Sequence, residues 1–71
     1  MWLLIECAFE DGPQTLIKDP ASEADVRAIQ ASADDPDTVL GIRCRLTPDG
    51  PDRLRLVRVG CITGLRLEES Q

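Results

Sequence analysis

The sequence contains no histidine, and this absence removes many kinds of active site. The serines have no histidine that could activate them as nucleophiles. The glycines do not form the spacing that cradles a phosphate group. We therefore expect a protein that is not an enzyme, with no catalytic residue and no cofactor site.

Cysteine is scarce, and its three positions, Cys7, Cys44 and Cys61, form no CxxC pair. Without histidine, three cysteines cannot supply the four ligands of the usual tetrahedral zinc site, so we expect no metal site. Each cysteine lies within an apolar strand pattern, which favours a role as a small core hydrophobe. A redox or metal-binding role is the weaker alternative.

Long hydrophobic runs are also absent. Residues 1–5 are apolar, but Glu6 ends the run, and neither a basic flank nor a small-residue cleavage site accompanies it. This pattern indicates a strand rather than a signal peptide. No apolar stretch approaches the roughly 20 residues that span a bilayer. We therefore expect no membrane association, and the cysteine pattern suits a reduced, cytoplasmic location.

Only two aromatic residues, Trp2 and Phe9, are present. Proteins that bind single-stranded nucleic acid stack the bases on aromatic rings, and this chain has too few for such a platform. The net charge of −5 also opposes binding to a phosphate backbone. We therefore expect no DNA partner, and an RNA-binding half-barrel is the weakest of the functional hypotheses.

The remaining composition is that of a small folded protein, with 42% hydrophobic and 30% charged residues in a chain of 71. We expect one domain over residues 1–71, with residues 68–71 as a frayed polar tail. A core of this size rarely supplies a net stability of more than about 3–5 kcal/mol, and small chains often gain stability by self-association. A homo-oligomer is therefore expected.

Alternating apolar and polar residues predict most of the fold. Residues 2–9 and 40–46 show the period of two of a strand, residues 14–18 predict a weaker strand, and two strands follow within residues 53–67. Ser22 and the acidic residues after it begin a short helix, which Pro36 ends. The predicted fold class is α+β. It is a small antiparallel sheet in the order strand, strand, helix, strand, strand, strand, and a strongly bent half-barrel is a variant of it.

The prediction of a buried aliphatic face and an exposed arginine face depends on residues 40–59. Aliphatic residues or cysteine alternate with glycine and arginine over residues 40–46, and residues 53–56 repeat this alternation after a turn at residues 47–52. We expect the aliphatic side chains, including Leu46, Leu54 and Leu56, to be buried together. Val57 and Val59 follow the opposite phase, which predicts a bulge or a strand covered on both faces.

Four arginines of these strands are then expected on one exposed face, because they alternate with the aliphatic residues: Arg43, Arg45, Arg53 and Arg55. Residues 1–37 carry nine acidic and two basic side chains, a net of −7, whereas residues 38–71 carry six arginines and four acidic side chains, a net of +2. The face is either a solvated surface with small ion pairs or a binding surface for carboxylates or phosphates. The candidate partner-binding residues are Arg43, Arg45, Arg53, Arg55, Arg58 and Trp2.

Trp2 is included because it lies with Leu4 on the second face of the first strand, either in the core or at a subunit contact. The main functional hypothesis is a small cytoplasmic interaction module, an inhibitor or an accessory subunit. It would bind a protein partner through the arginine face and strand edges. The alternative is a homo-oligomeric binder of an anionic small ligand, such as a nucleotide or another phosphorylated molecule.

Overall fold

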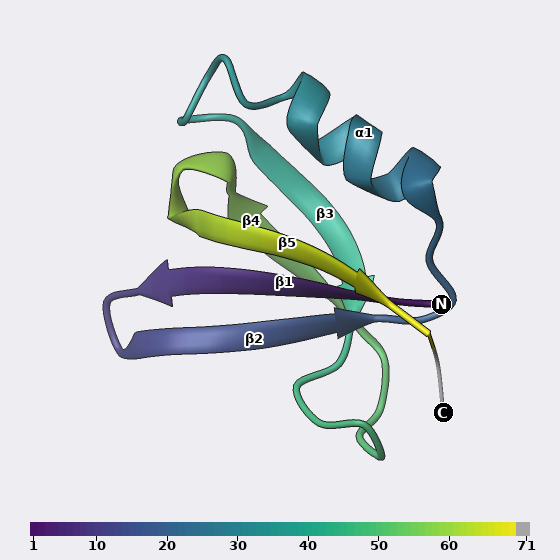
Figure 1. Cartoon of the computed structure of the whole chain (residues 1–71). Helices are drawn as coiled ribbons and strands as arrows, with labels where there is room; N and C mark the ends of the chain where they lie inside the picture. The colour runs from purple at the N-terminus through teal and green to yellow at the C-terminus, as the bar shows by residue number, and fades with distance from the viewer. Residues whose placement is uncertain (70–71) are drawn as a thin grey trace.

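The computed structural model describes residues 1–69, and over this range it forms an α+β domain with five antiparallel strands and one α-helix (Figure 1). The predicted order of elements is confirmed. The elements are β1 (Trp2–Phe9), β2 (Gly12–Lys18), α1 (Glu23–Ala31), β3 (Val39–Cys44), β4 (Arg53–Arg58), the short 3-10 helix η1 (Val59–Cys61) and β5 (Ile62–Glu68). Of the predicted tail, Glu68 belongs to β5, and residues 70–71 lie outside the described range.

Strand β1 is the centre of a three-stranded sheet in the order β2-β1-β5. It has the predicted bounds, whereas β2 begins two residues before the predicted position 14. The earlier start comes from the tight connection at Gly12, whose φ of 120° lies in a region that favours glycine. Because of this conformation, Phe9 pairs directly with Gly12 across the turn. The register shifts in this sheet between Glu6 and Cys7, where β1 pairs with β5.

Strands β3 and β4 form a second, two-stranded sheet. The two sheets meet where Ile17 and Arg45 exchange backbone hydrogen bonds, each N–H donating to the other residue's carbonyl oxygen at 2.8 Å. The strands therefore follow one another in the order β5-β1-β2-β3-β4, with the isolated Ile17–Arg45 bridge as the link between β2 and the β3–β4 hairpin. This arrangement lets both sheets line a common core.

The core takes its side chains from both sheets and from the helix. Its buried members are Leu3, Ile5, Cys7, Leu16, Ile29, Ile42, Cys44 and Val57. Cys7 and Cys44 are buried as predicted, and Cys61 is half-buried. Burial raises the pKa of both the Cys7 and the Cys44 thiol above the usual value of a cysteine, because apolar surroundings disfavour the thiolate. The two thiols therefore pack as neutral, apolar groups.

Helix α1 lies along β3 on one side of the molecule (Figure 1). Ser22 precedes it, and the Ser22 backbone N–H donates to the Asp25 carboxylate at 2.8 Å, which holds the first turn. Ile29 is the buried residue of the helix. Pro36 is the predicted end of the helix, but the helix already ends at Ala31, and the backbone N–H of Ala33 donates to the Gln30 carbonyl in a final turn.

Candidate functional site

The β3–β4 hairpin determines which side chains face the solvent. Its antiparallel register pairs Val39 with Arg58, Gly41 with Leu56, and Arg43 with Leu54. Directly opposed residues of an antiparallel pair project from the same side of the sheet. We call the surface formed by these six residues the outer face of β3–β4.

The outer face exposes three large aliphatic side chains. Val39, Leu54 and Leu56 are 53%, 64% and 74% exposed, respectively. Gly41 has no side chain that would separate the two leucines from the backbone. A Cβ at this position would lie 3.5 Å from Leu54 Cδ1 and 3.8 Å from Leu56 Cδ2. The leucines therefore lie over the glycine, and Arg43 and Arg58 flank the patch.

This arrangement corrects the predicted burial of the second aliphatic set. Leu54 and Leu56 are exposed, and so is Leu46, which follows the end of β3. No bulge interrupts β3–β4, and Val57 sets the phase of β4, since it is 1% exposed and pairs with Leu40. Burying Val57 turns both leucines outward, because neighbouring side chains of a strand point to opposite faces.

The predicted single arginine face is also wrong, because the register divides its members. Arg43 and Arg58 lie on the outer face, whereas Arg53 and Arg55 share the opposite face with Cys44 and Ile42. Arg53 is exposed and Arg55 is half-buried. Long arginine side chains tolerate this position, since their aliphatic stems can lie along apolar groups while the charge reaches water.

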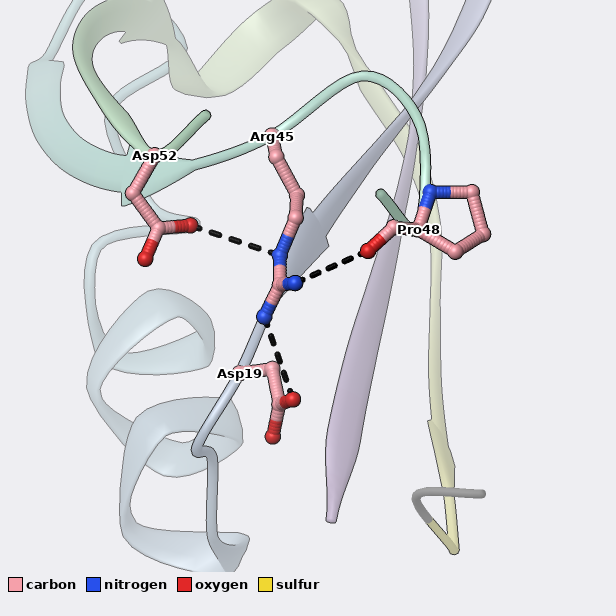
Figure 2. A network of polar contacts seen from close by, with 4 residues as sticks. All are labelled: Asp19, Arg45, Pro48 and Asp52. Carbon is pink, nitrogen blue, oxygen red and sulfur yellow. Dashed lines mark hydrogen bonds and ion pairs between the residues drawn. The ribbon is translucent and has the colours of Figure 1, made fainter. Parts of the chain in front are cut away.

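Arg45 is held inside the fold by three polar contacts (Figure 2). Its Nη1 donates to the Pro48 carbonyl at 2.9 Å, its Nη2 donates to Asp19 Oδ2 at 3.1 Å, and its Nε forms a longer ion pair with Asp52 Oδ1 at 3.4 Å. The side chain is only 20% exposed. Arg45 therefore ties the end of β2 to the 46–52 loop, and we assign it a structural role.

Trp2 lies far along the chain from the outer face, at the beginning of β1, where it pairs with Glu68. It is half-buried, on the second face of β1. Leu4 on the same face and its β2 partner Ile17 are buried within the single chain. The chain itself therefore covers part of the second face of β1, the face that suggested a subunit contact at Trp2.

A groove of about 210 Å³ separates α1 from β3 and is lined by Lys18, Asp25, Ile29 and residues 40–43, among others. Lys18 suits an anionic ligand, but the Asp25 carboxylate opposes one. The volume is below the roughly 300 Å³ at which small-molecule sites begin, and two larger hollows of about 310 and 370 Å³ have no arginine or lysine in their lining. The groove therefore gives the small-ligand hypothesis less support than the outer face gives protein binding.

Among residues 1–69, no group of three or more cysteine, aspartate or glutamate side chains lies close enough together to hold a metal ion. The described part of the chain also has no helix with the length and apolar character needed to cross a bilayer. Comparison with known proteins found no matching family model, no similar curated protein and no similar solved structure.

Sequence reasoning missed the aliphatic part of the outer face, namely Val39, Leu54 and Leu56. The useful pattern was the conflict between the leucines at 54 and 56 and the valines at 57 and 59. Only one of the two sets can face the core along a regular strand. A β-branched residue such as valine is the stronger strand former, which favours the valine phase.

Proposed function

We propose that this protein is a non-catalytic interaction module that binds a partner protein through the outer face of β3–β4. The observation that supports the proposal is the set of exposed aliphatic side chains, Val39, Leu54 and Leu56, that lie together on a regular hairpin. Burying a leucine side chain contributes about 1.5–3 kcal/mol, so a partner that covers this patch gains binding free energy.

The arginines specify the chemistry of the partner. Arg43 and Arg58 flank the aliphatic patch, and a guanidinium group pairs with a carboxylate through two parallel hydrogen bonds. Protein interfaces commonly combine an apolar centre with a polar rim, and arginine is enriched in them. The best-suited partner is a protein whose contact surface is apolar at its centre and acidic around it.

Affinity capture with a double variant tests this function. Leu54→Ser with Leu56→Ser removes most of the aliphatic patch, and the fold should persist because both side chains are exposed. Leu46→Ser is the matched control, since Leu46 is 46% exposed and lies beyond the end of β3. The immobilised proteins are compared on extracts of cells that naturally express the chain.

The proposal predicts that a partner retained by the parent and by Leu46→Ser is lost from the double variant. Circular dichroism of the three proteins establishes that they are equally folded. Equal recovery of the same partner on all three proteins would contradict the proposed face.

A further inference from the structure

The direction of the backbone groups in β4 follows from hydrogen bonds on both sides of the hairpin. Arg45 directs its N–H and C=O toward Ile17 of β2, so the alternate residues Cys44, Ile42 and Leu40 direct theirs toward β4. Val59 N–H donates to the Thr38 carbonyl at 2.8 Å. Through the register, Arg53, Arg55 and Val57 therefore direct their backbone groups toward β3, in phase with Val59.

The intervening residues of β4, Leu54, Leu56 and Arg58, consequently direct their N–H and C=O groups away from β3. Among residues 1–69, no strand pairs with this side of β4. β4 is thus an edge strand of six residues. An unpaired edge of this length is a template for another extended chain. Leu54 and Leu56 place their side chains on the outer face beside that same edge.

The side chains of β4 decide which extended chain fits. The strand contains arginine at 53, 55 and 58 and has no acidic residue. Pairing β4 with the β4 of a second copy would bring two strongly basic strands together, and opposed like charges destabilise a strand pair. A strand that places carboxylates near the arginines and aliphatic groups near Leu54 and Leu56 has the complementary pattern.

We propose that the open edge of β4 accepts an extended segment of a partner protein as an added strand, and that this segment alternates acidic and aliphatic side chains. Backbone hydrogen bonds to Leu54, Leu56 and Arg58 would hold the segment, and its side chains would select it. The inference rests on the proposed function, because the aliphatic contacts belong to the outer face of β3–β4.

A synthetic peptide of alternating glutamate and valine, as long as the six residues of β4, tests the proposal. Fluorescence anisotropy of the labelled peptide measures its binding to the full chain. One derivative carries N-methyl groups on every valine and another on every glutamate, so that each loses the N–H groups of one edge. A lysine–valine peptide tests the charge pattern.

We expect one methylated derivative to bind at least about tenfold more weakly, while the other stays within about twofold of the parent peptide, because only one edge of an added strand faces β4. The lysine–valine peptide should also bind at least about tenfold more weakly. Equal effects of the two methylation patterns, or no binding of the glutamate–valine peptide, would overturn strand addition.

A proline variant examines the same edge from the protein side. Leu56→Pro removes an N–H that points away from β3, so the β3–β4 hydrogen bonds are retained, and Leu56→Ser controls for the lost side chain. Leu56→Pro should bind the peptide at least about tenfold more weakly than Leu56→Ser does. Equal binding by the two variants would overturn the proposal. If Leu56→Pro does not fold, the methylated peptides decide alone.

The outcomes separate this inference from the proposed function. Loss of partner capture by the leucine double variant, combined with equal binding of both methylated peptides, retains the binding face and overturns strand addition. Unchanged partner capture overturns the proposed function and, with it, this inference. A parent protein that is dimeric by light scattering and monomeric as Leu56→Pro would show that a second copy occupies the edge, which also overturns the proposal.

Discussion

The two sheets use their faces differently. In the β2-β1-β5 sheet, β1 buries Leu3, Ile5 and Cys7 on one face and Leu4 on the other. In the β3–β4 sheet, Ile42, Cys44 and Val57 are buried, while the opposite face exposes two leucines and a valine. The first sheet buries aliphatic side chains on both faces, whereas the second buries them on one face only. We propose the exposed face of the second sheet as the binding side of the domain.

The largest expected effect concerns the first sheet. Ile5→Ala empties a fully buried position and should lower the free energy of unfolding by about 2–5 kcal/mol. Leu56→Ala on the outer face should change it by no more than about 0.5 kcal/mol. Urea denaturation of both variants measures the difference. Similar losses would show that the outer face contributes to folding and that the contrast between the sheets is false.

The buried side of the second sheet gives the next largest effect. Cys44→Ser places a hydroxyl in the core and should cost about 1–3 kcal/mol. Cys44→Ala should cost less where the neighbouring side chains relax into the space. Denaturation curves compare the two variants, and metal analysis of the parent serves as a control. A stoichiometric metal lost with the thiol would contradict the packing role.

The contacts of Arg45 connect the two sheets, and breaking them should have a smaller effect. Arg45→Met keeps much of the aliphatic stem but loses the bonds to Asp19 and Pro48, at a cost of about 1–2 kcal/mol. Arg66→Met is the control, because its ion pair with Glu68 is exposed and should contribute at most about 1 kcal/mol. Equal stability of the two variants would mean that Arg45 does not hold the sheets together.

The smallest expected effect is a loss of stability in alkali. Burial raises the pKa of the Cys44 thiol above its ordinary value of 9.0, although nearby Arg55 opposes the change. The folded thiol keeps its proton where the unfolded one loses it. This contribution is therefore complete below about pH 9 and is lost as the pH rises through the pKa of the folded thiol.

Cys44→Ala should consequently lose less stability than the parent when the pH is raised from about 8 to about 10. Thermal denaturation across this range measures both profiles. Cys7, whose pKa is also raised by burial, remains in the variant, so a residual slope is expected. Parallel profiles for the two proteins would show that the Cys44 thiol does not contribute.

Much of the fold could be predicted from periodicity. The bounds of β1 and the order of the elements follow from alternating residues, and Ser22 gave the beginning of the helix. The predicted second strand begins at residue 14, since Gly12 and Pro13 are residues typical of turns, whereas in the structure Gly12 opens β2 with a positive φ. The presence of turn-forming residues does not by itself show how many residues the loop of a hairpin contains.

The outer face of β3–β4 could be predicted only in part. Arg43 and Arg58 were named as candidates and lie on it, but the leucines were assigned to the core. Strand propensity favours the valine phase of β4, but the pattern within this strand does not settle which of the two competing phases the core buries. That choice depends on Val57 meeting Leu40 across the register, a contact between residues far apart in sequence. The predicted homo-oligomer stays a prediction.

The Ile17–Arg45 bridge also has a consequence for the local opening of the domain. Its two amide protons are held at the one place where residues 1–69 join the sheets by paired backbone hydrogen bonds. Amides in different cooperative units exchange with solvent at rates set by different opening events. The exchange rates of Ile17 and Arg45 therefore report how often the β3–β4 hairpin swings away from the β1-centred sheet while the latter stays closed.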